Sequence, residues 1–197
     1  MRKLTIAGLT IILGIACFVT YKHAYPQIIR SDSDYSLYSL GEMESLATVI
    51  VEAEFAGETA SVVPLDQQDQ YPIEANTFSQ IKIKKIYKGQ EHVGTSSRLN
   101  VIEHYGKWTN LWGSYQRMPN EVYKPLSPGR TYLLFLYKGP TQPAETYEII
   151  GNHQGKFAIQ HGNKALDNLT IANLDIQDDD QAYRDLYRDV AEKYKLN

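Results

Sequence analysis

The sequence predicts a mainly β fold with flanking helices, in which about six short strands curve into a partial barrel. Three observations predict this fold class. Short stretches within residues 37–175 alternate apolar and polar residues with period two, an uncharged segment precedes them at residues 4–21, and an amphipathic stripe follows at residues 176–197. The expected order is a single N-terminal transmembrane helix, a β domain and a C-terminal amphipathic helix.

Length and composition favour one domain with an appendage. The chain has 197 residues, of which 43% are hydrophobic, and this is enough for a real core. Its formal net charge is -3, and its Lys and Arg residues are scattered, so nucleic acid is not expected as a partner. A single Cys excludes an internal disulfide framework and a multi-cysteine zinc site.

The first 21 residues read as a membrane anchor or signal segment. The uncharged stretch at residues 4–21 would rise about 27 Å as a helix, just long enough to span a bilayer. Arg2 and Lys3 precede it, which favours a cytoplasmic N-terminus and a domain outside the cell membrane.

Two alternatives for this segment stay open. Cys17 follows a small residue and could carry the lipid of a lipoprotein, and cleavage after Ala24 would give a secreted protein. Each fate places the β domain outside the membrane. Residues 22–36 contain Pro26 and a Ser/Asp cluster, which predicts a stalk.

The domain at residues 37–175 is expected to begin with a short helix. Ser39 and Glu42 have the spacing of a capping box. Alternation then predicts a first strand that ends at Gly57, a long loop, and a second strand with a bulge near Lys85. An irregular segment is expected between the third and fourth strands. The expected strands are 48–57, 77–88, 99–104, 131–137, 147–150 and 156–159, with 131–137 central because it is apolar on both faces.

A helix is expected from about Asp178 to the end of the chain. Apolar residues recur on one face, which predicts that this face is buried against the sheet. The alternative is a tyrosine-rich face offered to a partner, with Tyr183, Tyr187 and Tyr194 as candidate contacts.

Three strand segments resemble netrin and metalloproteinase-inhibitor modules, the NTR/TIMP-like OB-fold proteins. The segments are 48–55, 78–89 and 126–136. The same succession is more closely similar to envelope proteins of Gram-positive bacteria, which also show a segment like residues 152–157. The resemblance implies an OB-like partial barrel. Metalloproteinase inhibitors present a free N-terminal Cys and are held by disulfides, and residues 22–197 contain no Cys, so inhibition is not implied.

No sequence motif for catalysis, metal binding or a cofactor is present. The chain lacks a nucleophile elbow, a phosphate loop and a zinc-protease motif, and its histidines lack ligand spacing. A hydrolase would require His104 to meet Glu103 and a second carboxylate in one pocket.

The segment between residues 105 and 123 holds both tryptophans and several cations. Aromatic faces beside cations and amides suit a glycan, a peptide or a membrane interface. The alternative is that Trp108 and Trp112 lie on a short helix that plugs the barrel. The candidate ligand-binding residues are Tyr105, Trp108, Trp112, Tyr115, Arg117 and Tyr123.

These observations favour a membrane-tethered, extracytoplasmic binding module without catalytic activity. The expected ligand is a protein or an envelope glycan bound through the aromatic segment. The alternative is a structural component that joins a membrane complex through the C-terminal helix, and a hydrolase is the third possibility.

Overall fold

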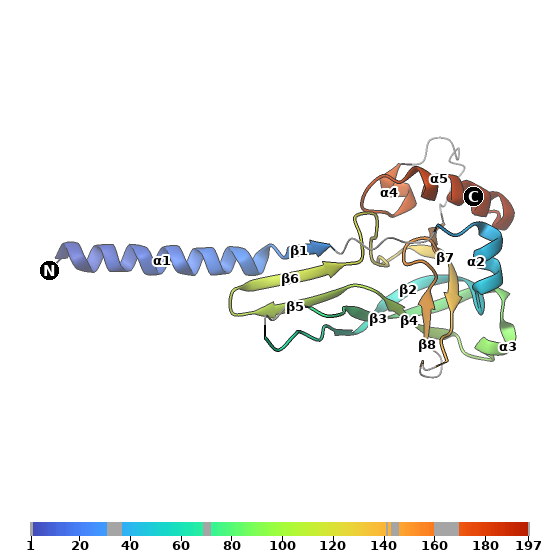
Figure 1. Ribbon diagram of the computed structural model, residues 1–197, viewed down its shortest axis with the longest axis horizontal. Coiled ribbons are helices and arrows are strands. Elements are labelled where there is room, and N and C mark those ends of the chain that lie inside the picture. The colour runs from blue at the N-terminus through green and yellow to red at the C-terminus, as the bar shows by residue number, and fades with distance from the viewer. Residues whose placement is uncertain are drawn as a thin grey trace.

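The computed structural model describes residues 2–30, 37–68, 72–140, 142, 146–159 and 170–196, with the backbone alone for residues 2–11. In this part of the chain five helices and nine strands form, and the strands make two sheets (Figure 1). The predicted mainly β fold with flanking helices is therefore confirmed. The helices are α1 (Arg2–Ala24), α2 (Leu40–Leu46), α3 (Gln90–Val93), α4 (Ile171–Leu174) and α5 (Gln181–Tyr194). The strands are β1 (Gln27–Arg30), β2 (Val49–Val62), β3 (Asn76–Lys88), β4 (Arg98–Glu103), β5 (Gly106–Asn110), β6 (Gly113–Met118), β7 (Thr131–Tyr137), β8 (Thr146–Ile149) and β9 (Lys156–Ala158).

Five strands of the larger sheet pair in a closed ring. β2 pairs with β3, β3 with β4, β4 with β8, and β8 with β7, which returns to β2. All these pairs are antiparallel except β4 with β8, which is parallel. β9 pairs with β7 on the same edge as β8. These pairings satisfy the backbone groups of β7 along both of its edges.

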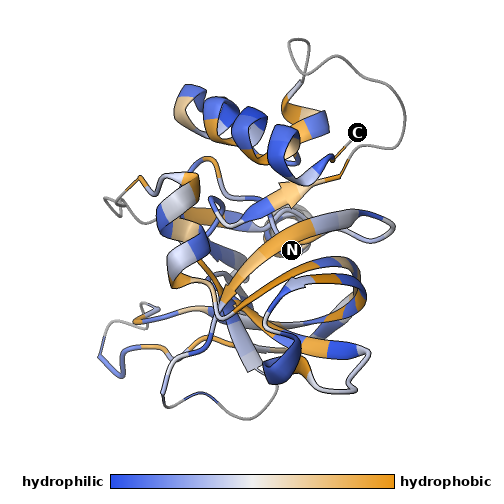
Figure 2. Ribbon diagram, turned by 90° about the vertical axis from the view of Figure 1, so that its right-hand side faces the viewer, coloured by the Kyte–Doolittle hydropathy of each residue, from blue (hydrophilic) through white to orange (hydrophobic). Residues whose placement is uncertain are grey.

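β7 is the central strand that the sequence predicts, and its residues alternate between two cores. Tyr132, Leu134 and Leu136 lie in the cluster that also contains the buried residues of β3 and β4. Leu133 and Phe135 face the other way, into a cluster with residues of α2, β9 and α5. Figure 2 shows α5 above the sheet, with hydrophobic residues concentrated in the strands. The apolar run on β7 is therefore explained by burial on both faces.

β2 is longer than the sequence predicts. It continues through Gly57 to Val62, so the predicted end at Gly57 is wrong. Gly57 takes a φ of 146°, and the pairing with β3 shifts register between Phe55 and Gly57. A glycine with this backbone conformation bends the strand without ending it. The irregularity predicted for β3 is confirmed by register shifts on either side of Lys85.

The segment predicted to be irregular contains a hairpin, β5–β6, and this prediction is wrong. Asn110 precedes the turn, and its side-chain oxygen accepts a hydrogen bond from the Trp112 amide at 2.8 Å. Gly113 follows with a positive φ of 154°. The same finding overturns the plugging helix, because Trp108 lies on β5 and Trp112 in the turn.

The predicted stalk also contains a strand. β1 pairs in parallel with β6, with Gln27 opposite Tyr115 and Arg30 opposite Met118. The stalk prediction is therefore wrong for residues 27–30, and residues 31–36 lie outside the described residues. β1 holds the end of α1 beside the hairpin (Figure 1).

Both predicted helices of the domain are confirmed. The Ser39 hydroxyl accepts a hydrogen bond from the Glu42 amide, and Glu42 accepts one from the Ser39 amide, which completes the capping box. α5 begins with Asp180 as its N-cap, slightly later than predicted. The Tyr183 and Tyr187 hydroxyls donate to the carbonyls of Lys156 and Ala158 on β9, at 2.5 and 2.6 Å.

α1 extends from the β domain as the N-terminal helix (Figure 1). Among the residues searched, which exclude the side chains of residues 1–11, no helix is long and apolar enough to cross a membrane.

Candidate functional site

The structure divides the six predicted ligand-binding residues between the core and the β5–β6 hairpin. Tyr105 and Tyr123 are buried, and their hydroxyls donate to Glu58 and Glu103 at 2.5 Å each. Burial and the neighbouring carboxylates raise the pKa of both phenols. These two tyrosines therefore belong to the core.

The β5–β6 hairpin carries the four remaining residues. The Trp108 ring stacks on Tyr115 with centroids 5.3 Å apart, and Trp112 is 66% exposed at the turn. Arg117, on β6, donates to the Pro72 carbonyl and lines a cavity on the side of the β domain. Of the six candidates, only Arg117 lines a described cavity.

The other predicted sites are placed as follows. Tyr183 and Tyr187 are buried beneath α5, so their rings offer no surface to a partner. Tyr194 is partly buried and donates to Glu44 at 2.7 Å. Cys17 is a free, exposed cysteine on α1.

Two adjoining cavities follow β8 and form what we call the β8 groove. Their volumes are about 400 and 300 Å³, and Glu148, Ile149 and Gly151 line both. The larger cavity is lined by Ile73, Glu74, Ala75, His104, Arg117, Pro119, Glu148, Ile149, Gly151 and Asn152. The smaller cavity is lined by Tyr38, Leu46, Tyr137, Glu148, Ile149, Ile150 and Gly151.

A chain of hydrogen bonds crosses the polar end of the groove. Asn76 donates its amide to Glu74 at 2.7 Å, which leaves its oxygen 2.9 Å from His104 Nδ1. His104 Nε2 contacts Glu148 Oε1, and Gln142 donates to the other oxygen of Glu148 at 2.9 Å. Residues from three segments distant in sequence therefore meet here.

His104 contacts an acceptor oxygen through each of its two ring nitrogens. The hydrogen bond from His104 lowers the pKa of the Glu148 carboxyl, although burial opposes this shift. The polar end thus presents a His and a carboxylate in contact, each with a side chain about one third exposed.

The other end of the groove is aromatic. Tyr137 is 40% exposed at the end of β7, and Tyr38 approaches from the segment before α2. Gly151 has a φ of 58°, and a Cβ there would lie 3.1 Å from the Tyr38 ring. Gly151 therefore permits the close approach of Tyr38 to the groove floor.

The carboxylate set that a hydrolase would require is not assembled. Glu103 and His104 are adjacent on the chain but point to opposite faces, as neighbours along an extended strand do. Glu103 is buried and accepts from Ser79 and Tyr123, whereas His104 faces the groove and contacts Glu148. Among the described residues, no group of three or more His, Cys, Asp or Glu could hold a metal ion.

Sequence reasoning missed most of the groove. It noted His104 and Arg117 but not Asn76, Glu148 or Tyr137, because these residues are brought together by strand pairing. The pairing of β4 with β8 places Ile102 opposite Glu148 and so sets Glu148 beside the end of β4. No local pattern in the sequence encodes that parallel pairing.

A buried histidine lies next to the groove residue Asn152. Burial lowers the pKa of His153 to about 4, although Asp180 opposes this shift. The folded state therefore keeps His153 neutral at pH values where the unfolded chain, with a pKa near 6.5, binds a proton.

We expect the free energy of unfolding to fall as the pH drops from 6.5 toward 4. The contribution of His153 to the slope approaches about 1.4 kcal/mol per pH unit, because the unfolded state binds one more proton in this window. Urea unfolding of the wild type and His153→Gln between pH 7 and pH 5 measures this. The variant should show a flatter profile, and identical slopes would contradict the assignment.

The comparisons with known proteins give no family. No protein-family model matches the chain, and a search of curated proteins finds no similar protein.

Proposed function

We propose that the protein is a membrane-tethered, extracytoplasmic binding module without catalytic activity, built on an OB-like barrel. The ring of β2, β3, β4, β8 and β7 supports the OB-like assignment, because that fold is a five-stranded Greek-key barrel. OB-type barrels bind ligands through a sheet face and the loops beside it. The β8 groove lies against the loop between β2 and β3, which contributes Ile73, Glu74 and Ala75.

The β8 groove is the observation that carries the proposal. Its aromatic end, with Tyr38 and Tyr137, offers faces for the apolar side of a sugar ring. Its polar end offers the Glu148 carboxylate, the Asn152 amide and the Arg117 guanidinium, which can hydrogen-bond hydroxyl and acyl groups. We propose an envelope glycan as the ligand, and a protein ligand is the alternative.

The uncharged run at residues 4–21 supports the tether, with Arg2 and Lys3 on the cytoplasmic side. We propose that residues 4–21 are retained as a membrane anchor. Lipidation at Cys17 and cleavage to a secreted form are the alternatives.

The structure favours the groove over α5 as the binding surface. The tyrosine face of α5 packs in the same core as Phe135 and Phe157. Removal of residues 178–197 would therefore expose this core as well as remove a contact surface.

Replacement of Tyr137 by Ala is expected to weaken glycan binding about tenfold, the loss of one stacked aromatic face. Binding of the full-length protein, in detergent, to purified cell-wall glycan strands measures this. Trp112→Ala is the matched control, because it removes an exposed aromatic that lines neither cavity.

The two variants together decide between the groove and the hairpin. Unchanged binding by Trp112→Ala with weakened binding by Tyr137→Ala supports the groove. Weakened binding by Trp112→Ala with unchanged binding by Tyr137→Ala would instead assign the ligand to the β5–β6 hairpin. If the wild type does not bind the glycan strands, a glycan is not the ligand.

A further inference from the structure

The turn of the β5–β6 hairpin exposes two large apolar side chains. Leu111 is 77% exposed and Trp112 is 66% exposed, and neither lines the β8 groove. The turn itself is held by the hydrogen bond from the Trp112 amide to Asn110. The hairpin thus presents an apolar tip that the β domain does not cover, and such a surface suits an interaction site.

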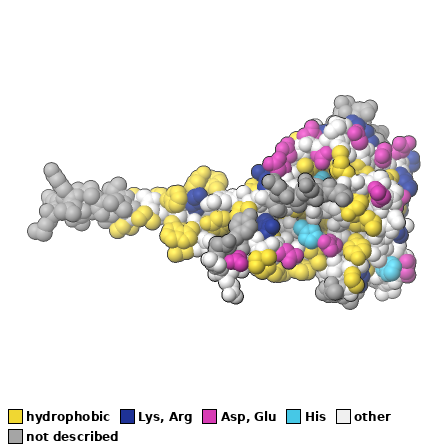
Figure 3. Space-filling model, viewed as in Figure 1, with side chains coloured by type: hydrophobic (Ala, Val, Ile, Leu, Met, Phe, Trp, Pro, Cys, Tyr) yellow, Lys and Arg dark blue, Asp and Glu magenta, His cyan; other side chains and the backbone are white. Residues whose placement is uncertain are grey.

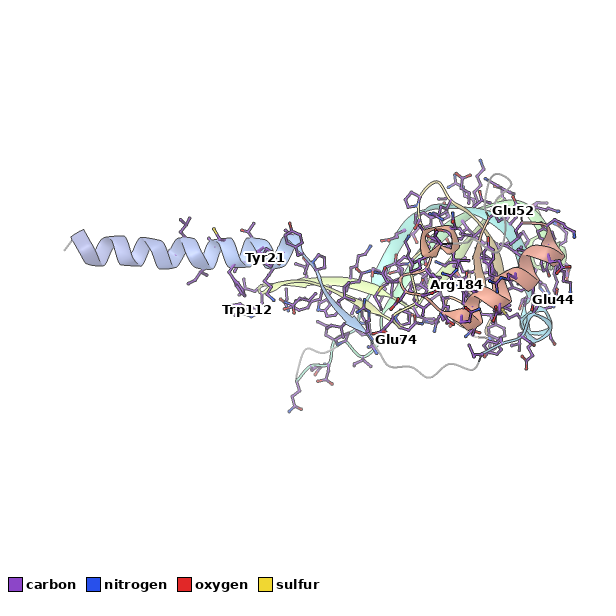
Figure 4. The ribbon with its side chains drawn as sticks, turned by 90° about the horizontal axis from the view of Figure 1, so that it is seen from above. Tyr21, Glu44, Glu52, Glu74, Trp112 and Arg184 are labelled. Atoms are coloured by element: carbon purple, nitrogen blue, oxygen red, sulfur yellow. The ribbon has the colours of Figure 1, made fainter. Side chains whose placement is uncertain are left out.

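The register of β1 fixes where this tip lies. β1 runs parallel to β6, and Gln27 is opposite Tyr115, so the start of β6 lies beside the end of α1. A Cβ built on Gly113 would lie 3.1 Å from the carbonyl oxygen of Lys22. Figure 4 shows Tyr21 and Trp112 at this junction, on α1 and on the hairpin. Trp112 therefore lies level with the end of the uncharged run at residues 4–21.

The side chains in the last turns of α1, with Tyr25 directly after it, are of the types found at a membrane interface. Phe18, Tyr21 and Tyr25 are 58%, 59% and 64% exposed, and the rings of Tyr21 and Tyr25 lie 4.8 Å apart. The Lys22 ammonium lies 5.6 Å from the centre of the Phe18 ring. Figure 3 shows hydrophobic side chains gathered where α1 meets the hairpin. Tyr, Trp and Lys at the end of an apolar helix mark the headgroup level of a bilayer.

We propose that Leu111 and Trp112 insert into the interfacial layer of the membrane that α1 enters, so that the hairpin is a second membrane contact. The inference rests on the proposed tether. We choose a lipid surface as the partner for two reasons. The hairpin tip is level with the end of the uncharged segment, and it lies beside the exposed aromatic side chains of α1.

A second contact would fix the height of the groove above the membrane. Arg117 lies four residues from Gly113 along β6, so it stands about 13 Å along the strand from Gly113, the residue after Trp112. With α1 alone, the β domain could tilt about the end of one helix. With the hairpin inserted, the polar end of the β8 groove would be held near the membrane surface.

Quenching of tryptophan fluorescence by brominated lipids tests the inference on the full-length protein. Trp108→Phe leaves Trp112 as the single tryptophan, and Trp112→Phe leaves Trp108. Both are reconstituted in phosphatidylethanolamine–phosphatidylglycerol vesicles with bromine near the headgroup end of the acyl chains. Trp112 is expected to lose emission and to shift to shorter wavelength. Trp108, which is stacked on Tyr115 and lies four residues from Trp112, is expected to lose much less.

Flotation of the same vesicles separates the inference from the tether on which it rests. Co-flotation with quenching confined to Trp112 supports both. Co-flotation with equal or absent quenching of the two tryptophans overturns the hairpin contact and leaves the tether standing. Failure of the full-length protein to float with the vesicles overturns the tether and the hairpin contact together.

Discussion

Replacement of Glu103 by Ala is expected to lower the free energy of unfolding by about 3 kcal/mol or more, because it leaves three buried donors without their acceptor. Glu103 is 1% exposed. Its carboxylate accepts from the Ser79 hydroxyl, the Tyr123 hydroxyl and the Leu126 amide, at 2.5, 2.5 and 2.9 Å. These bonds join β4 to β3 and to the segment before β7.

Urea unfolding at pH 7 measures this loss. Glu121→Ala is the matched control, since Glu121 is exposed, and its change should stay within about 0.5 kcal/mol. A Glu103→Ala variant that is as stable as the control would show that the three donors find other partners.

Replacement of Asp175 by Asn is expected to cost about 3–5 kcal/mol, the range for removing one partner of a buried ion pair. Lys156 and Asp175 are both fully buried, with Nζ and Oδ2 3.9 Å apart. Burial lowers the pKa of Lys156 to about 8, although Asp175 opposes this shift. Burial also acts to raise the pKa of Asp175, but Lys156, with Lys124 2.7 Å away, holds it below its usual value.

The Asp175→Asn substitution removes the negative charge and keeps the size and shape of the side chain. Asp175 adopts a left-handed conformation with a φ of 58°, which Asn tolerates, and the amide oxygen can still accept the hydrogen bond from Tyr132. The double variant Asp175→Asn with Lys156→Met should recover much of the loss, because no unpaired buried ammonium remains. Additive losses in the double variant would contradict the pairing.

The elements predicted correctly are those with strong local signals. The alternation on β3 and β4, the apolar run of β7 and the capping box at Ser39 each encode their own element. Gly57 was misread because a glycine can bend a strand as well as end one. The β5–β6 hairpin has a weaker local signal, because its turn depends on the Asn110 side chain and on the positive φ of Gly113 and not on an alternating apolar pattern.

The candidate site was harder to predict because its residues are assembled by long-range pairing. Aromatic content identified the segment around Trp108 and Trp112, but Tyr105 and Tyr123 prove to be core residues bonded to carboxylates. Strand alternation could have separated Glu103 from His104 at the outset. The contact of His104 with Glu148 depends on the closure of the ring, which no local pattern reveals.

Site-specific crosslinking on intact cells tests the central claim most directly. Benzoylphenylalanine replaces Tyr137 in the β8 groove or, as a control, Ile171 at the start of α4, which is 36% exposed and lines neither cavity. Our account predicts that the Tyr137 position captures envelope glycan and that the Ile171 position does not. Equal capture at both positions, or capture at neither, would contradict the assignment of the β8 groove as the binding site.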